Sequence, residues 1–429
     1  TMSLGFPVFH HYQHLSHIPL TFIHVITLEA VSVIDLIRWT TYILLCLFPL
    51  SIFWSLRRFG FDPLTSAMGG LLAPLIGNDF QLWGGFGYDN YTFGGFGLYA
   101  QLSGMVLFPA ALAVGYETVR TGQRFFWSTL LLSATLMTHL TFGYIAFLTL
   151  GVLALIPKSQ ITFDKSYMVS IWDQCRRLLG LFVLVVSVTL YFTVPFLLDR
   201  AHFGSTIANT DELVSGSLGM QSILEALVKG DLFDLDRIPS FSILALLGVA
   251  CCVFYWRTNR YLVPLAVFIL WLLLCFGRTT WGPVIDLLPF SQSLHMHRFV
   301  AGVHLGGILL AAVALAVPWR WAVTKGSAAY LGGALTLTLL VLAPVIIELA
   351  SYFSENAGEK RDNEQALEDE REDLDNLVAT LKSMPPGRVF AGLTAESGDQ
   401  WGAGYSVGDT PVAQILGVAG FDIFSATLH

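Results

Sequence analysis

Long apolar runs separated by polar connections are the feature that most constrains the fold of this chain. The clear runs are Leu36–Trp54, Gly95–Tyr116, Phe125–Met137, Phe142–Ile156, Leu178–Leu198, Phe241–Trp256, Tyr261–Phe276, Phe299–Val317 and Tyr330–Ala350, with a shorter one at Leu64–Ile76. A helix needs about 20 mostly apolar residues to cross a bilayer. Only 13% of the 429 residues are charged, whereas a soluble domain carries about 25%. The sequence therefore predicts an all-α integral membrane protein with about ten transmembrane helices.

The lysines and arginines between the runs test that count. They occupy alternate connections, at Arg57, Arg58, Arg120, Arg124, Lys158, Lys165, Arg176, Arg177, Arg257, Arg260, Arg320 and Lys325. Short loops rich in lysine and arginine stay on the cytoplasmic side of a membrane. These residues share one side only if every run crosses. We therefore predict a multi-pass protein of the plasma membrane, with the N-terminus and C-terminus of this chain both extracytoplasmic.

Three regions follow from this topology. Residues 1–35 are predicted to form an extracytoplasmic loop with an amphipathic stretch at Leu20–Ile34, residues 36–350 a polytopic domain, and residues 351–429 the start of an extracytoplasmic C-terminal domain. In the last region we expect a charged helix over Asn363–Lys382 and a strand over Arg388–Gly392, which together make a small α/β segment. The polar, loop-like start at Thr1 leads us to expect a fragment that is truncated at its N-terminus.

The net charge of -8 owes much to one acidic block, Glu364 to Asp375. The rest of the chain is close to neutral and has no basic surface suited to nucleic acid. The sequence also has no phosphate-binding glycine loop opening a helix, no HExxH and no GxSxG. The common soluble-enzyme classes are therefore disfavoured, and nucleic acid is not an expected partner.

The first extracytoplasmic segment is rich in histidine. Histidines between residues 10 and 17 have the spacing of ligands on one helix face, which leaves a divalent cation open as a cofactor. No carboxylate stands beside them, and histidine and aromatic rings also suit the headgroup zone of a membrane. We therefore predict no metal site, and we assign His11 and Tyr12 a substrate-lining or interfacial role.

A glycine- and aromatic-rich loop between residues 78 and 97 is the next candidate. Asp79 or Asp89 could act as a general base that deprotonates an acceptor hydroxyl. Trp83 and Tyr88 could stack against sugar rings. The alternative is a tightly turning loop whose glycines seat aromatic rings at the interface.

Two further candidates come from polar residues at helix ends. His139 lies at the tip of a predicted hairpin with its turn at Thr138–Thr141, and an ionisable group near membrane depth is a functional candidate by default. It could instead hydrogen-bond a carbonyl group in that turn.

The loop before the run that starts at Phe299 contains Arg278, His295, His297 and Arg298. Two arginines on the side opposite the basic loops need a local reason, and the planar guanidinium suits a phosphate. The alternative for Arg278 is a headgroup contact or an ion pair with Asp286.

The order of these segments resembles a known family. The matching pieces are Gly5–Pro19, Gly94–Ala113, Thr138–Gly143 and Leu288–Gly307, together with PPGRVFAGL and WGAGYSVGDTP in the C-terminal region. They are similar to polytopic GT-C-type membrane glycosyltransferases, and above all to large bacterial and archaeal membrane proteins whose names refer to 6-pyruvoyl-tetrahydropterin synthase. The similarity extends over nearly the whole chain.

The resemblance implies a transferase that moves a sugar from a polyprenyl-phosphate donor in the membrane lipid to an extracytoplasmic acceptor. Such enzymes hold the lipid phosphate with basic residues, and Arg298 matches that place. Their catalytic base is an acid early in the first extracytoplasmic loop, which we expect before Thr1, so Asp79 and Asp89 are weak candidates. The alternatives are a non-catalytic scaffold that handles a lipid or glycan and, with less support, a transporter. Donor sugar, acceptor and oligomeric state are not determined by the sequence.

Overall fold

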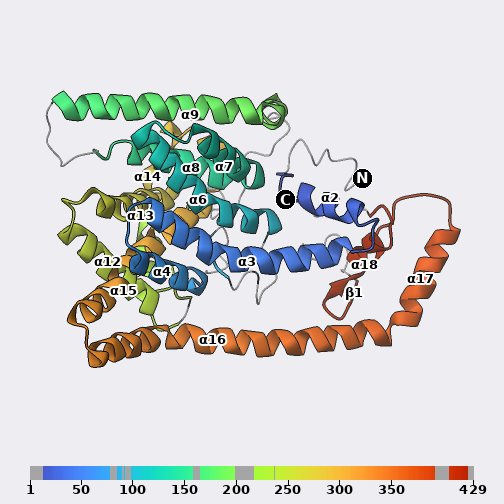
Figure 1. Cartoon of the computed structure of the whole chain (residues 1–429). Helices are drawn as coiled ribbons and strands as arrows, with labels where there is room; N and C mark the ends of the chain where they lie inside the picture. The colour runs from blue at the N-terminus through green and yellow to red at the C-terminus, as the bar shows by residue number, and fades with distance from the viewer. Residues whose placement is uncertain are drawn as a thin grey trace. The chain divides into compact units, whose positions relative to one another are not determined.

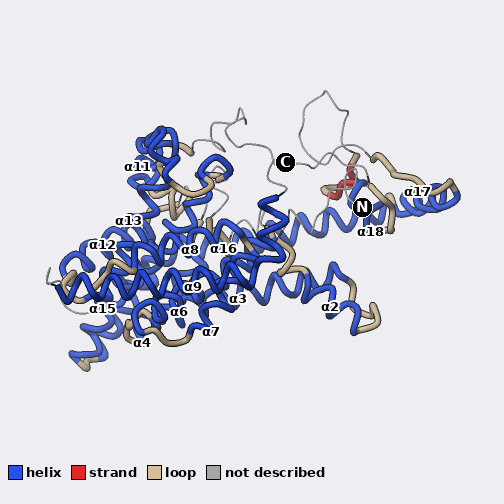
Figure 2. The backbone as a smooth tube through the Cα atoms, turned by 90° about the horizontal axis from the view of Figure 1, so that it is seen from above, coloured by secondary structure: helices blue, strands red, loops and turns tan. Residues whose placement is uncertain are grey.

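The computed structural model describes residues 13–77, 85–88, 91, 98–157, 165–198, 217–235, 237–391 and 405–423. The elements in these ranges are α2 (Ile18–Ile26), α3 (Val33–Arg58), α4 (Pro63–Leu72), η2 (Ala73–Leu75), α6 (Tyr99–Thr121), α7 (Phe125–Thr138), α8 (Leu140–Leu153), α9 (Lys165–Leu198), α11 (Gly219–Lys229), α12 (Ser240–Phe254), η6 (Asn259–Tyr261), α13 (Leu262–Cys275), α14 (Gly277–Trp281), η7 (Gly282–Leu287), η8 (Ser291–Ser293), η9 (Met296–Phe299), α15 (Val300–Lys325), α16 (Ala328–Asp369), α17 (Arg371–Ser383), β1 (Ser406–Val407), β2 (Thr410–Pro411) and α18 (Val412–Val418). Helix therefore predominates throughout, as the tube in Figure 2 shows.

The chain divides into two compact units. The larger unit comprises residues 13–348, and the smaller one combines the first twelve residues with residues 349–429. In Figure 1 the larger unit is a bundle in which α9 runs along one side, next to α7 and α8. All of the candidate site residues that the structure describes lie in this larger unit.

Helix α15 forms the centre of the larger unit. It packs against α12, α13 and α4, and its side chains are almost wholly buried from Val300 to Ala316. Glycine lets the helices approach closely, because a Cβ atom at Gly306 would lie 2.6 Å from the Cα atom of Phe268 in α13. Small residues at helix contacts are typical of helical packing in membranes.

Helices α3, α9 and α16 are apolar but mostly exposed. Their outward side chains include Leu50, Val183 and Leu340, each of which is more than half exposed. Apolar patches of this extent are unfavourable in water. Together with α6 and the helix pair η9 and α15, these three make five helices long and apolar enough to cross a membrane among the described residues.

A bent pair of helices raises that number to six. The segments Asn259–Cys275 and Gly277–Leu287 pass the same test together, but they are bent by 78° at Phe276. The apolar stretch Val284–Pro289 falls partly in the 3-10 helix η7 of this pair. Helices α7, α8 and α12 are apolar but shorter, and α4 is shorter still.

Capping groups explain where several helices begin and end. The Ser32 hydroxyl accepts a hydrogen bond from the Asp35 amide at 3.1 Å, which starts α3 well before Leu36, the predicted start. Asp62 caps α4 in the same way, and Pro63 follows it at the first helical position. The predicted turn at Thr138–Thr141 is wrong in extent, because α7 and α8 are separated by His139 alone, which has extended backbone angles.

The smaller unit has little core. Ala391, Ala413 and Leu416 are its buried residues, and α17 contributes partly buried side chains. Asn363 accepts a hydrogen bond from the Asp409 amide at 2.9 Å, which fixes the turn between β1 and β2. The strand predicted over Arg388–Gly392 is wrong for the described residues 388–391, because there only Val389 pairs, in a single bridge with Ile423.

Candidate functional site

The connections of the larger unit gather at two ends, and the first of these is rich in arginine. Arg58, the last residue of α3, donates to Glu117 of α6 at 2.7 Å, and Arg260 before α13 donates to the Gly60 carbonyl at 3.1 Å. Arg177 of α9 donates to the Arg120 carbonyl at 2.8 Å. We call this region, with Arg58, Arg120, Arg177 and Arg260, the arginine end.

The opposite end contains histidines that are mostly buried. His14 contacts Tyr191 of α9 through Nε2 and the hydroxyl oxygen at 3.1 Å, and Tyr191 in turn donates to the Met137 sulfur at 3.6 Å. His139 is two residues beyond Met137, and His297 is fully buried in η9. We call this region, with His14, His139, His297 and His304, the histidine end.

His139 closes the tip of the α7 and α8 hairpin. Its amide donates to the Thr135 carbonyl, its carbonyl accepts from the Gly143 amide, and its ring packs on Phe142 with the centroids 4.2 Å apart. Gly104 of α6 permits this fit, because a Cβ atom there would lie 2.7 Å from the His139 Cβ atom. The Nδ1 atom is buried and has no hydrogen-bond partner among the described residues. An imidazole nitrogen is therefore available at this position.

Arg298 is a charged group close to two histidines of this end, His139 and His295. It lies in η9, it is half-buried, and its positive charge acts on both His139 and His295. Burial, followed by the charge of Arg298, lowers the pKa of His295 to about 4. His295 is therefore neutral at pH 7, and its ring meets that of His297 edge to face at 5.8 Å. The sequence interpretation placed His295, His297 and Arg298 together because they are neighbours in the chain, and it treated His139 as a separate candidate. The structure brings His139 close enough to Arg298 for the charge to act on it.

Arg278 has a different arrangement. Its Nη1 atom lies 2.8 Å from Asp286 Oδ1, and Ser291 donates to the same oxygen at 3.1 Å. The ion pair that was the alternative in the sequence interpretation is therefore present. The short helix that contains Arg278 still packs against η9, so Arg278 lies beside the Arg298 segment.

The described residues 85–88 of the aromatic loop lie inside the bundle and not at its surface. Phe86 is fully buried among Phe48, Phe108 and Phe142, and its amide donates to His304 Nδ1 at 2.9 Å. Tyr88 is almost as buried, and its hydroxyl donates to the Leu45 carbonyl. Tyr88 therefore packs in the core and is not placed to stack on a sugar. His11, Tyr12, Asp79, Trp83 and Asp89 lie outside the described residues.

Several polar residues of the histidine end were missed in the sequence interpretation. His304 interrupts an apolar run, so the argument applied to His139 would have found it. The Tyr144 hydroxyl is buried without a hydrogen-bond partner in the described part of the chain, and its ring stacks on Phe299 at 6.3 Å. No group of three histidine, cysteine or acidic residues that could hold a metal occurs among the described residues.

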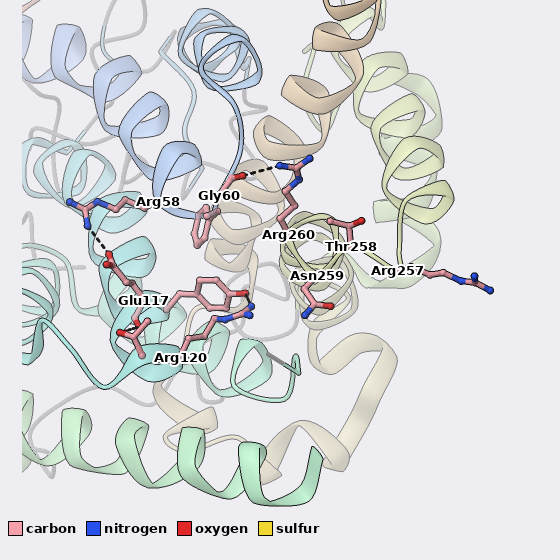
Figure 3. A pocket seen from close by; sticks show the side chains of 11 residues that line it. Arg58, Gly60, Glu117, Arg120, Arg257, Thr258, Asn259 and Arg260 are labelled. Atoms are coloured by element: carbon pink, nitrogen blue, oxygen red, sulfur yellow. Dashed lines mark hydrogen bonds and ion pairs between the residues drawn. The ribbon is translucent and has the colours of Figure 1, made fainter. Parts of the chain in front are cut away.

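A pocket of about 600 Å³ opens at the arginine end (Figure 3). Four arginines and one glutamate contribute to its lining: Arg58, Arg120, Arg257, Arg260 and Glu117. From the sequence, the four arginines predicted only which side of the membrane this end faces, and Glu117 was not a candidate. Their convergence depends on three connections that are far apart in the sequence, so no local motif predicts the pocket.

The fold and its apolar exposed helices define a class, that of all-α membrane proteins with several spanning helices. Within that class the chain belongs to a family described as a family of unknown function (DUF6541), whose profile matches residues 25–378. The match includes α3 to α15 and therefore both ends of the bundle. No curated protein matches the chain.

Proposed function

We propose that this chain is part of a GT-C-type glycosyltransferase that uses a polyprenyl-phosphate sugar donor and acts on an extracytoplasmic acceptor. The observation that carries the proposal is the grouping of Arg298 with His139, His295 and His297 at one end of an apolar bundle. A guanidinium group binds a phosphate through paired donors, and a half-buried position strengthens that contact by reducing screening.

Ten crossings are part of this proposal. Among the described residues, six spans are long and apolar enough to cross when the bent pair is counted as one span. Helices α4, α7, α8 and α12 would be the four shorter crossings. Contacts between connections support this number. Asn259, which follows α12, donates to the carbonyl of Pro157, which follows α8. Asp62, which precedes α4, pairs with Arg320 near the end of α15. These connections therefore meet at the arginine end. Alternate connections gather at the histidine end, through Ser217 with Cys275 and Gly77 with Phe233.

The orientation follows from the same grouping. The arginine end carries the basic loops, and the positive-inside rule assigns it to the cytoplasm. The histidine end, and with it the C-terminal region that we predict to form a small α/β segment, is then extracytoplasmic at the plasma membrane. A polyprenyl phosphate would reach Arg298 from the outer leaflet.

The length of the α7 and α8 hairpin sets the depth of His139 in the membrane. Helices α7 and α8 have 14 residues each, which is about 21 Å at 1.5 Å per residue and shorter than a bilayer core of about 30 Å. If the hairpin begins at the cytoplasmic surface, His139 lies below the outer surface. The neutral rings of His139 and His295 then accept or donate hydrogen bonds beside the phosphate on Arg298. The catalytic base is not assigned to a described residue.

The test compares Arg298→Gln with Arg278→Gln in the full-length protein. Binding of undecaprenyl phosphate is followed by native mass spectrometry, and transfer is followed as labelled sugar incorporated into surface glycan. Arg298→Gln is expected to weaken lipid binding about tenfold or more, since it removes a charge-assisted bond. Arg278→Gln is the matched control, because its charge is already paired with Asp286.

The outcomes separate the candidate functions. If Arg298→Gln binds the lipid as well as the control variant does, the proposed role of Arg298 is wrong. If the unmodified protein binds the lipid but transfers no sugar, the chain belongs to a lipid-handling scaffold instead. Apolar side chains exposed on α3, α9 and α16 suit either function, because both operate in a bilayer.

A further inference from the structure

The pocket at the arginine end is separate from the proposed phosphate site. It is built from the end of α3, the end of α6 and the connection between α12 and α13 (Figure 3). The proposed transferase uses none of its residues. The positive-inside rule accounts for basic loops at this end, but it does not require that they line a common pocket.

The geometry of the arginines favours an anion. In Figure 3 the side chain of Arg257 points away from the other labelled residues, whereas Arg120 lies beside Asn259. Arg120 donates to the Tyr116 hydroxyl, which orients the guanidinium. Arg260 donates to the Gly60 carbonyl, and its Nε atom is buried without a hydrogen-bond partner in the part of the chain that the structure describes.

One acid stands against four arginines among the described residues of the lining. Glu117 bonds Arg58 at 2.7 Å and also pairs with Arg124, outside the lining, at 2.8 Å. One carboxylate therefore serves two arginines, and positive charge predominates in the described lining. A pocket with this excess of positive charge attracts anions.

We propose that this pocket binds a phosphate-bearing anion through Arg120 and Arg260, with Asn259 as a polar neighbour. Arginine offers planar, paired donors that suit phosphate oxygens. Given the orientation in the proposed function, the phosphate is that of an anionic lipid of the cytoplasmic leaflet or of a soluble phosphate compound. Trp54 and Trp256, which stack on Arg58 and Arg257, supply aromatic rings of the kind found at membrane interfaces.

The experiment uses the full chain in detergent and native mass spectrometry. The probes are phosphatidylglycerol, the zwitterionic phosphatidylcholine and inorganic pyrophosphate. The double variant Arg120→Gln with Arg260→Gln is expected to bind phosphatidylglycerol at least about tenfold more weakly than the unmodified chain, because two charge-assisted contacts are lost. Arg176→Gln is the matched control, since it removes an exposed positive charge outside the lining.

A variant with the opposite effect protects the test against misfolding. Glu117→Gln removes the only acid among the described residues of the lining and is expected to strengthen binding several-fold. Loss of affinity in the double variant and gain in Glu117→Gln support the site. Competition by pyrophosphate then identifies a soluble phosphate as the ligand, and its absence identifies the lipid headgroup.

The proposal is overturned if the double variant and Arg176→Gln bind phosphatidylglycerol and pyrophosphate equally well. It is also overturned if Glu117→Gln leaves binding unchanged. Neither readout involves sugar transfer or Arg298, so failure here is distinguishable from failure of the proposed function.

Discussion

The two ends of the larger unit handle polar groups in opposite ways. At the histidine end, His304 is fully buried and its two ring nitrogens contact the Phe86 amide and the Leu232 carbonyl at 2.9 and 2.8 Å. At the arginine end, Arg58 and Arg124 share Glu117 while part of each side chain remains exposed. Buried polar groups that lose a partner are costly, whereas exposed ion pairs contribute little. The difference teaches that His304 joins core segments through buried hydrogen bonds, whereas the ion pairs of the arginine end remain partly open to solvent.

The largest effect on stability is expected from His304→Ala. The substitution leaves a buried amide and a buried carbonyl without partners and opens a cavity in the core. The free energy of unfolding should fall by about 3 kcal/mol. Unfolding of the purified protein in detergent measures it, with His304→Gln as the control that keeps a polar side chain. A loss under about 1 kcal/mol would contradict the comparison.

Asp234→Ala should come next. Asp234 is fully buried at the start of α12, where it accepts hydrogen bonds from the Phe241 amide at 2.9 Å and from the Ser242 amide and hydroxyl at 2.8 Å. Its removal leaves helix-start donors unsatisfied, which costs about 2 kcal/mol. Asp234→Asn keeps an acceptor and should lose less. Equal losses in the two variants would show that the acceptor oxygens do not matter.

A much smaller effect is expected at the other end. Glu117→Gln breaks two ion pairs that are partly exposed, so the free energy of unfolding should change by less than about 1 kcal/mol. The same detergent unfolding assay applies, with added salt as a second condition. A loss as large as that of His304→Ala would mean that the arginine end is also part of the rigid core.

The stability of the two ends should also depend differently on pH. The folded pKa of His295, about 4, is below its ordinary value of 6.5, so this end loses stability as pH falls from 6.5 through 4. At the arginine end, burial of Asp62 would raise its pKa, but hydrogen bonds from Thr65 and the charge of Arg320 lower it below 3.8. Its contribution is present above pH 3.8 and is lost only at lower pH.

The pH prediction is checked with His295→Asn, which removes the titrating group. The midpoint temperature of unfolding should fall less between pH 6.5 and pH 4 in this variant than in the unmodified chain. Asp62→Asn serves as the control, since its change should be confined to more acidic conditions. A His295→Asn variant with the same pH slope as the unmodified chain would show that His295 is not buried as described.

The apolar pattern determined much of the architecture. Every predicted run is mainly helical over its described residues, because a long apolar segment satisfies its backbone groups within a helix. The alternation of basic loops predicted that Arg58, Arg120 and Arg260 share one end, and their contacts lie at one end of the larger unit. The sequence also grouped His295, His297 and Arg298, since they are neighbours in the chain.

Tertiary structure decided where the polar groups of distant segments meet. Phe86 and Tyr88 belong to a glycine-rich segment expected at the surface, yet both are buried in the core. There His304 accepts a hydrogen bond from the Phe86 amide, and the Leu45 carbonyl accepts one from the Tyr88 hydroxyl. Arg278 finds Asp286, and the pocket at the arginine end forms from three separate connections. Local propensity and hydropathy report on each segment alone, whereas these contacts depend on which helices pack together. That is the reason the helices were predictable from the sequence and the two polar sites were only partly so.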